Sequence, residues 1–230
     1  MTPSDHISTL SEADYARGEL REKDAVTRMT PRMSRELNEI GLSLGSPVYI
    51  RVFKESRELE IWCLHQASGR YRHFKTWRIA AMSGLLGPKL AEGDFQAPEG
   101  FYHAKKSQLR PDSNYHLAIN VGYPNRYDLA HKRTGDFIMI HGNRLSAGCL
   151  AMTDPSMEEI YTLCHSALAN GQPFFRIHIF PFRMTDERLA GETQHRWYDF
   201  WMNLKEGYDW FEEKETPPDV SVKNKRYVFQ

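Results

Sequence analysis

The order of strand-like and helix-like segments restricts the fold of this 230-residue chain more than any other feature. From residue 48 to residue 180, short runs rich in β-branched and aromatic residues alternate with turns, and helix-type segments between them are few. A doubly wound parallel sheet would need a helix after almost every strand. The pattern therefore predicts a β-rich α+β domain with mixed sheets or a β-sandwich. The expected strands are Val48–Phe53, Leu59–Leu64, Tyr71–Ala80, Gly100–His103, Tyr115–Val121, Asp136–His141 and Pro173–Phe180.

Three segments carry a helical pattern. Apolar residues recur at helical spacing from Pro31 to Leu44, and a glycine follows the last of them. Asp154 and Pro155 open a second helix, and residues 185–213 form a third with an aromatic face. We therefore expect a loosely docked polar leader (1–26) and a helix within 1–46, a central domain over 47–184, and a helical C-terminal extension (185–230) packed on that domain.

Charge and hydropathy exclude several classes of protein. Lys and Arg number 30 and Asp and Glu number 30, so the chain lacks the basic excess that marks nucleic-acid binding. No run of about 18 apolar residues could span a membrane, and the first residues do not form a secretory signal. The chain is therefore either cytoplasmic or a mature form from which a signal peptide has been removed.

The segment from Ile138 to Met152 holds the residues best suited to catalysis. A strand-like run ends at His141, and Cys149 follows a short loop of mostly small and polar residues. A thiol attacks a carbonyl after losing its proton, and an imidazole within hydrogen-bond reach takes that proton. Small residues beside the cysteine let backbone N–H groups approach a substrate carbonyl closely. The spacing lets the loop fold back and set His141 against Cys149.

The other cysteines and histidines fit structural roles. Cys164 lies on the apolar face of its predicted helix and Cys63 alternates within a strand, so both are expected to be buried; whether they are paired stays open. His116 either faces the substrate or is structural. A zinc site formed by His116, His141 and Cys149 lacks paired-ligand spacing, so we expect neither metal nor cofactor.

Several motifs together resemble one family. His141-Gly142 followed by Ser-Ala-Gly-Cys at 146–149 resembles the signature of the L,D-transpeptidase (YkuD-type) catalytic domain, with closer similarity to its YafK-like branch. The resemblance runs from about residue 48 to the C-terminus. Its other motifs are Ala97–Tyr102, Gly122–Asn125, Phe180–Met184 and Trp201–Asp209.

The resemblance implies a role for each matching residue. Cys149 would be the acyl-accepting nucleophile, His141 its base, and the carbonyl of Gly142 would orient the imidazole. Backbone N–H groups around Gly148 and Cys149 would form the oxyanion hole, and Ser146 would brace the loop. The resemblance also implies a YkuD-like fold for the central domain.

The resemblance further implies a substrate, a partner and a location. The donor would be a peptidoglycan stem peptide centred on meso-diaminopimelate, held as a thioester on Cys149 in the periplasm. If water resolves the thioester, the enzyme is an amidase that releases a peptidoglycan-linked lipoprotein from diaminopimelate, which the YafK-like resemblance favours. If an amine resolves it, the enzyme is a transpeptidase that forms crosslinks or attaches lipoproteins. An inactive peptidoglycan-binding module is the alternative from another class.

Two departures from the family pattern affect the expected substrate contacts. The loop between the histidine and the cysteine is about half the usual length, and Ala147 and Ala151 stand where the family often has histidine and a basic or amide residue. Substrate contacts must therefore come from elsewhere. The candidates are Asn143, Arg144, His116, Tyr123 and Asn125.

Overall fold

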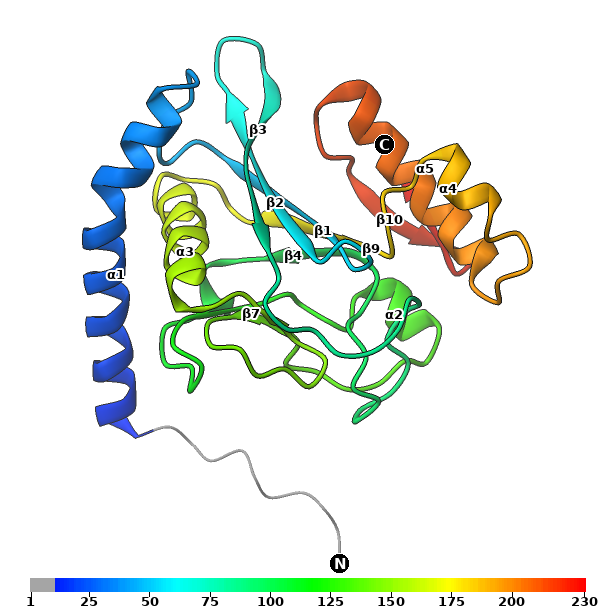
Figure 1. The fold of residues 1–230 in the computed structure, drawn as a ribbon, viewed down its shortest axis with the longest axis horizontal. Helices are drawn as coiled ribbons and strands as arrows, with labels where there is room; N and C mark the ends of the chain where they lie inside the picture. Colours follow the sequence, from blue (N-terminus) through cyan, green and yellow to red (C-terminus); the bar gives the residue numbers. More distant parts are fainter. Residues whose placement is uncertain (1–10) are drawn as a thin grey trace, which may run out of the picture.

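A five-stranded mixed sheet forms the centre of the molecule in the computed structural model, which describes residues 11–230. Its strand order is β3-β2-β1-β9-β4, in which β1 and β9 run parallel and the other neighbours run antiparallel. Helices α1 and α3 lie on one side, and α4, α5 and a C-terminal hairpin lie on the other (Figure 1). The five strands, all predicted, are β1 Val48–Phe53, β2 Glu58–His65, β3 Arg70–Arg78, β4 Gly100–Ala104 and β9 Phe175–Phe180.

A second, four-stranded sheet carries the segment that contains His141. Its order is β5-β6-β7-β8, with β7 and β8 parallel. The predicted strands over 115–121 and 136–141 are both shorter than expected, because His116 and Phe137 adopt positive φ angles of 68° and 52° that break the extended backbone. The strands are β5 Leu109–Arg110, β6 Ala118–Asn120, β7 Met139–His141 and β8 Leu150–Ala151. The observed mixture of helices and sheets confirms the predicted α+β class.

Helix α1 corrects the prediction for the N-terminal segment. It spans Glu12–Asn38, 27 residues, whereas the sequence predicted a polar leader followed by a helix over 31–44. Ser11 and Asp14 form a capping box at its start, and Pro31 lies inside it. Residues 1–10 of the predicted leader lie outside the described residues. Within residues 11–230, no helix is both long enough and apolar enough to cross a bilayer.

Charged side chains hold α1 against α3, which spans Asp154–Ala169 as predicted. Arg28 pairs with Glu158 at 2.6 Å, and Arg32 pairs with Glu159 at 2.8 Å. Ala25, Met33 and Leu37 of α1 are fully buried in the core. Most side chains of residues 12–24 are exposed, so the first half of the helix shows little apolar periodicity, and the sequence pattern underestimated its length.

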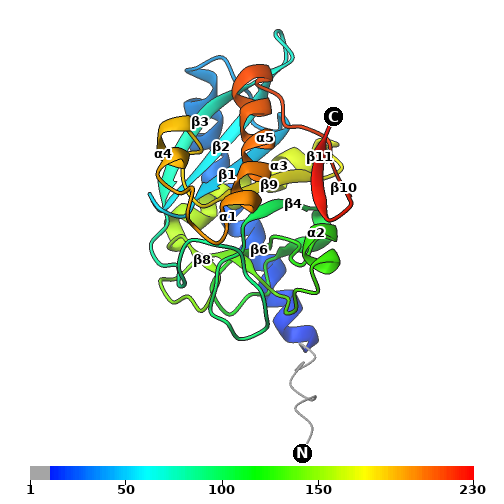
Figure 2. The same cartoon turned by 90° about the vertical axis from the view of Figure 1, so that its right-hand side faces the viewer.

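The C-terminal extension covers the outer face of the five-stranded sheet (Figure 2). Its predicted single helix over 185–213 is interrupted, because residues 191–197 form turns between α4 and α5. Aromatic side chains of α5, among them Trp201 and Tyr208, pack with Phe53, Phe101 and Phe180 of the sheet. The elements are α4 Asp186–Ala190, α5 Tyr198–Lys214, β10 Val220–Lys223 and β11 Arg226–Phe229. Two short helices, Lys106–Gln108 and α2 Arg126–Ala130, complete the fold.

A buried ion pair joins the sheet, the long loop over 83–98 and α5. The Lys54 ammonium lies 3.0 Å from the Glu99 carboxylate, and the two side chains are 1% and 0% exposed. Glu99 also accepts hydrogen bonds from the Gly87 N–H at 2.6 Å and from Trp201 Nε1 at 2.8 Å. Burial lowers the pKa of Lys54, and the Glu99 carboxylate opposes that effect. The carboxylate therefore keeps a buried cation charged while it ties three segments together.

Replacing Glu99 with glutamine is expected to lower the free energy of unfolding by about 3 kcal/mol, because it leaves the Lys54 charge buried without a partner. Urea denaturation followed by tryptophan fluorescence measures the change. Glu213→Gln is the matched control, since the Glu213 side chain is 71% exposed and its loss should change stability by less than about 0.5 kcal/mol. Equal urea denaturation midpoints for Glu99→Gln and the wild type would contradict a stabilising role for the Lys54–Glu99 ion pair.

Candidate active site

Parallel pairing of β7 with β8 brings the segment that contains Cys149 beside the strand that carries His141. His141 lies opposite Ala151 in the register, and Cys149 immediately precedes β8. The Cys149 sulfur lies 3.4 Å from the backbone nitrogen of Met139, two residues before His141. The loop between the two residues therefore folds back on β7.

His141 is held in the tautomer of a general base. Its Nδ1 lies 2.5 Å from the carbonyl oxygen of Gly142. A carbonyl can only accept, so Nδ1 carries the proton and Nε2 remains an acceptor. Burial lowers the pKa of His141, against the smaller raising effect of the Gly142 carbonyl, so the imidazole is neutral near pH 7. The ring of Tyr115 lies against it, with centroids 4.8 Å apart.

The surroundings of Cys149 favour the neutral thiol over the thiolate. Burial raises the pKa of Cys149, against smaller lowering effects of the Met139 N–H and the Lys89 charge. The sulfur accepts a hydrogen bond from the Met139 N–H at 3.4 Å and faces the Phe137 carbonyl at 3.8 Å. Within the described chain no hydrogen bond joins it to His141. Such catalytic contacts often close only when substrate is bound.

Of the two backbone donors expected for the oxyanion hole, one is already engaged. The Gly148 N–H donates to Ser83 Oγ at 2.6 Å. The Cys149 N–H, by contrast, has no acceptor among residues 11–230. Ser146 Oγ donates to the Cys149 carbonyl at 2.6 Å. Gly148 adopts a φ of 101°, a conformation that favours glycine.

The short loop after His141 is fixed by the start of α3. Asp154 Oδ1 accepts from the Asn143 N–H at 2.6 Å, and Asn143 Oδ1 accepts from the Arg144 N–H at 2.5 Å. A Cβ at Gly142 would come within 2.5 Å of Asp154 Oδ1 and 2.8 Å of the Tyr115 carbonyl. Only glycine fits this position, so the carbonyl that binds His141 is rigidly placed. The Arg144 residue is exposed beside it.

The other three predicted substrate contacts are engaged in interactions outside this loop. The His116 imidazole pairs with Glu158 of α3 at 2.9 Å. Tyr123 is buried and its hydroxyl donates to the Thr134 carbonyl at 3.1 Å. Asn125 is the N-cap of α2. Of the five candidates, the structure thus brings only Asn143 and Arg144 into the loop between His141 and Cys149.

Four residues that the sequence did not single out surround the site. Tyr115 covers His141, Ser83 binds the Gly148 N–H, Lys89 contributes a positive charge near the thiol, and Asp154 anchors the loop. Asp154 carried a signal, since it opens a predicted helix. Ser83 and Lys89 carried none, because they reach the site from a long loop that has no pattern of its own.

The remaining cysteines are free and buried, so they are not paired with each other. Burial raises the pKa of Cys63 to about 12 and also raises that of Cys164. Cys149 is thus the partly exposed thiol of the three. In the part of the chain that the structure describes, no group of three or more His, Cys, Asp and Glu side chains is placed to hold a metal ion.

Comparison with known proteins identifies the family. A sequence model of the L,D-transpeptidase catalytic domain (YkuD) matches residues 47–179. The protein YafK of Escherichia coli K12, whose name assigns it to the L,D-transpeptidases, is 47% identical over 185 residues, which are 80% of this chain and 74% of YafK. YafK of Escherichia coli O157:H7 gives the same values.

Three solved structures are similar over much of the chain. The K307A mutant of the helical cell shape determining protein Pgp2 from Campylobacter jejuni has a TM-score of 0.48 at 19% identity, and the match covers 86% of this chain and 64% of that one. Another Pgp2 structure gives 0.46 at 20%, covering 84% and 80%. Bd1075 from Bdellovibrio bacteriovorus gives 0.41 at 19%, covering 78% of each chain.

The family match spans more than half of the chain, and the match to YafK spans most of both proteins. These findings confirm the resemblance that the motifs around His141 and Cys149 indicated. The chain therefore belongs to the L,D-transpeptidase (YkuD) family.

Proposed function

We propose that this protein is a cysteine amidase that hydrolyses the bond between the diaminopimelate of a peptidoglycan stem peptide and the lysine of a bound lipoprotein. The observation that carries the proposal is the state of His141, whose Nδ1–H binds the Gly142 carbonyl and leaves Nε2 free to accept a proton. The partly exposed thiol of Cys149 lies beside the same strand, 3.4 Å from the Met139 backbone nitrogen.

The first half of the reaction forms a thioester. Nε2 of His141 takes the Cys149 proton as the sulfur attacks the amide carbonyl, and the Cys149 N–H stabilises the resulting oxyanion. The imidazolium then gives its proton to the departing lysine amine as the C–N bond breaks. The stem peptide remains bound to sulfur as an acyl group.

The second half returns the enzyme to its starting state. His141 takes a proton from water as the water oxygen attacks the thioester, and the C–S bond breaks to leave a carboxyl group on diaminopimelate. The sulfur recovers its proton from the imidazolium. No redox step or cofactor enters this sequence, and every proton passes through Nε2 of His141.

Hydrolysis is favoured over transfer by the surroundings of position 151. Ala151 is fully buried, and its backbone is hydrogen-bonded to the segment after β3. The Ala151 carbonyl accepts from the Ala80 N–H at 2.8 Å, and the Ala151 N–H donates to the Ala81 carbonyl at 3.0 Å. This position offers no cation or amide that could hold the carboxylate of an amine acceptor.

Substrate binding is assigned to the loop and its exposed neighbours. The Arg144 guanidinium would bind a carboxylate of the stem peptide, and Asn143 would hold the loop that presents it. Exposed apolar side chains from adjoining segments would pack on the aliphatic part of diaminopimelate; these are Leu85, Phe95, Phe137 and Leu145.

The proposed substrate also sets the location. L,D-transpeptidases act on peptidoglycan, which lies outside the cytoplasm, and we therefore propose a periplasmic protein with a peptidoglycan-linked lipoprotein as its macromolecular partner. The alternative is a transpeptidase of the same compartment that forms crosslinks or attaches lipoproteins, which the name of the YafK relatives favours.

Incubation with two substrates separates these functions. Purified protein is added to sacculi that carry bound lipoprotein and, separately, to free tetrapeptide muropeptides, and the products are identified by mass spectrometry. We expect released lipoprotein with a free lysine amine and no new muropeptide dimers. New dimers, or D-amino acids exchanged into the stem, would instead establish a transferase, and unchanged substrates would indicate an inactive binding module.

A further inference from the structure

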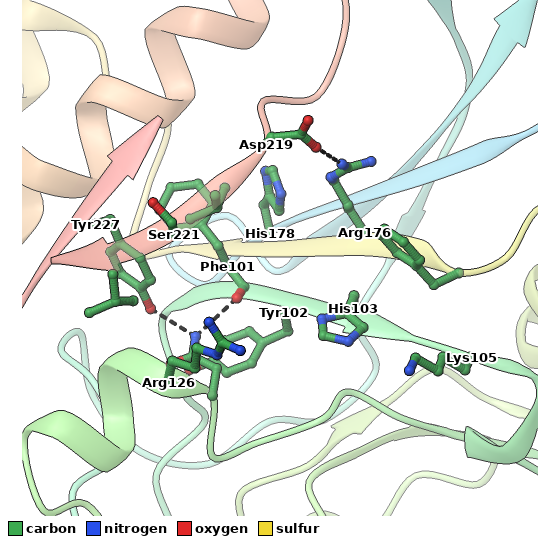
Figure 3. Close-up of a pocket in the computed structure, with 14 residues that line it drawn as sticks. Phe101, Tyr102, His103, Lys105, Arg126, Arg176, His178, Asp219, Ser221 and Tyr227 are labelled. Carbon is green, nitrogen blue, oxygen red and sulfur yellow. Dashed lines mark hydrogen bonds and ion pairs between the residues drawn. The ribbon is translucent and has the colours of Figure 1, made fainter. Parts of the chain in front are cut away.

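A cavity lies away from Cys149, between the edge of the five-stranded sheet and the C-terminal hairpin. It has a volume of about 560 Å³ and is lined by residues of β4, β9, β10 and the start of α2 (Figure 3). None of its lining residues contacts Cys149 or His141 through a hydrogen bond in the described chain. The hairpin and β8 lie on opposite sides of the molecule in Figure 2.

The rim of this cavity is positively charged. Lys105, Arg126 and Arg176 line it, against a single carboxylate from Asp219 that pairs with Arg176. Figure 3 draws no partner for the side chains of Lys105 or Arg126 among the lining residues. The cavity therefore presents two unneutralised cations to anything that enters it.

A buried donor points into the same cavity. His178 is 1% exposed and its Nδ1 lies 2.8 Å from the Tyr49 hydroxyl. That hydroxyl has no other hydrogen-bond partner among residues 11–230, so it donates to Nδ1, and the proton of the neutral imidazole resides on Nε2. Nε2 has no partner in the described chain, although His178 lines the cavity. An N–H that borders a cavity and has no acceptor in the protein is available to a ligand that accepts.

Burial and nearby positive charges both lower the pKa values of the two histidines that line the cavity. The pKa of His103 is lowered by burial and then by the charges of Lys105 and Arg176. The pKa of His178 is lowered by burial and then by Arg176 and Arg51. An anion bound in the cavity would reverse the charge effect and raise both pKa values.

The walls and the size of the cavity narrow the class of anion. The Phe101 ring lies 4.7 Å from His178, and the Phe174 ring lies 5.4 Å from His103, centroid to centroid. A volume of about 560 Å³ is far larger than an inorganic anion needs, and it lies within the range of organic ligand sites. Aromatic walls and a cationic rim suit an extended acid with an aliphatic portion.

We infer that this cavity binds a second peptidoglycan stem peptide through one of the carboxylates of the peptide. This inference rests on the proposed function. The carboxylate pairs with Lys105 or Arg126, another oxygen of the peptide accepts from His178 Nε2, and the aliphatic part packs on Phe101 and Phe174. Stem peptides repeat along a glycan strand, so a neighbouring stem is always close to the one at Cys149. Binding both raises the effective concentration of substrate at the thiol.

The test uses the full chain with Cys149→Ala, so that muropeptide is bound without turnover. The His103 and His178 imidazoles are followed by NMR across a pH titration, with and without a disaccharide tetrapeptide muropeptide. We expect the muropeptide to raise the pKa of His103 and to shift the Nε2 resonance of His178. Adding Lys105→Gln and Arg126→Gln should weaken this response at least about tenfold in dissociation constant.

Lys223→Gln is the matched control, because Lys223 is an exposed cation of the same hairpin that does not line the cavity. Equal weakening by this control, or muropeptide that leaves the His103 pKa unchanged, would overturn the inference. Inorganic phosphate that gives the same response at the same concentration would overturn it in favour of a general anion site. Failure of the proposed function would appear separately, as wild-type protein that releases nothing from sacculi.

Discussion

Cys149→Ala protein is expected to release no lipoprotein from sacculi, with turnover lowered by at least about 10⁴-fold. The thioester cannot form without the sulfur, and no other thiol can replace it, because Cys63 and Cys164 are buried and free within the core. Mass spectrometry of wild-type protein quenched in acid should find the stem peptide attached to the tryptic fragment that contains Cys149.

Cys164→Ala is the control for this experiment. Cys164 is fully buried, so its replacement creates a small cavity and lowers stability without removing the nucleophile. The folded fraction of Cys164→Ala should keep wild-type turnover and the adduct on Cys149. Full activity in folded Cys149→Ala protein would exclude the cysteine mechanism.

His141→Gln is expected to lower the rate of acylation by about 10²–10⁴-fold, because the thiol loses the base that takes its proton. The pH profile of the wild type follows from the pKa directions at the site. Burial lowers the pKa of His141, so the neutral imidazole persists to a pH below about 6.5. Activity should be constant around pH 7 and fall only as the pH drops through that lowered value.

The pKa of the Cys149 thiol is shifted in the opposite direction from that of His141. Burial raises its pKa, so the free enzyme holds neutral thiol and neutral imidazole rather than a thiolate–imidazolium pair. Alkylation of Cys149 by iodoacetamide should therefore be slow at pH 7 and should accelerate as the pH rises through a value above about 8.5. Fast alkylation that continues down to pH 5 would instead demonstrate a preformed ion pair and would contradict this description.

The sequence predicted the central sheet well because its strands are marked by composition and bounded by turns. Val48–Phe53 is buried throughout and Phe175–Phe180 almost throughout, and apolar and aromatic residues make up most of both strands. Helix α1 was underestimated because most side chains of its first half are exposed and show no apolar pattern. The small sheet was overestimated because a positive φ at His116 or Phe137 leaves no pattern in the sequence.

Some residues of the candidate site could be predicted from the sequence and others could not. His141, Gly142 and Cys149 could be found because they lie on one short segment whose two ends form parallel strands. Ser83 and Tyr115 could not, since they reach the segment from elsewhere in the chain. Asn125 was assigned to the substrate, yet a residue that caps a helix has the same sequence pattern as one that rims a site. The roles of the substrate-contact residues and the division into three domains stay predictions.

The ion pairs between α1 and α3 make the neighbourhood of the active site responsive to ionic strength. Arg28 is 54% exposed, so dissolved salt screens its attraction to Glu158. Glu158 also binds His116, whose neighbour Tyr115 lies against the His141 ring. Salt that weakens the Arg28–Glu158 pair leaves His116 as the remaining partner of that carboxylate within the described residues. Ionic strength in the surrounding solution therefore acts, through α1 and α3, on the segment that covers His141.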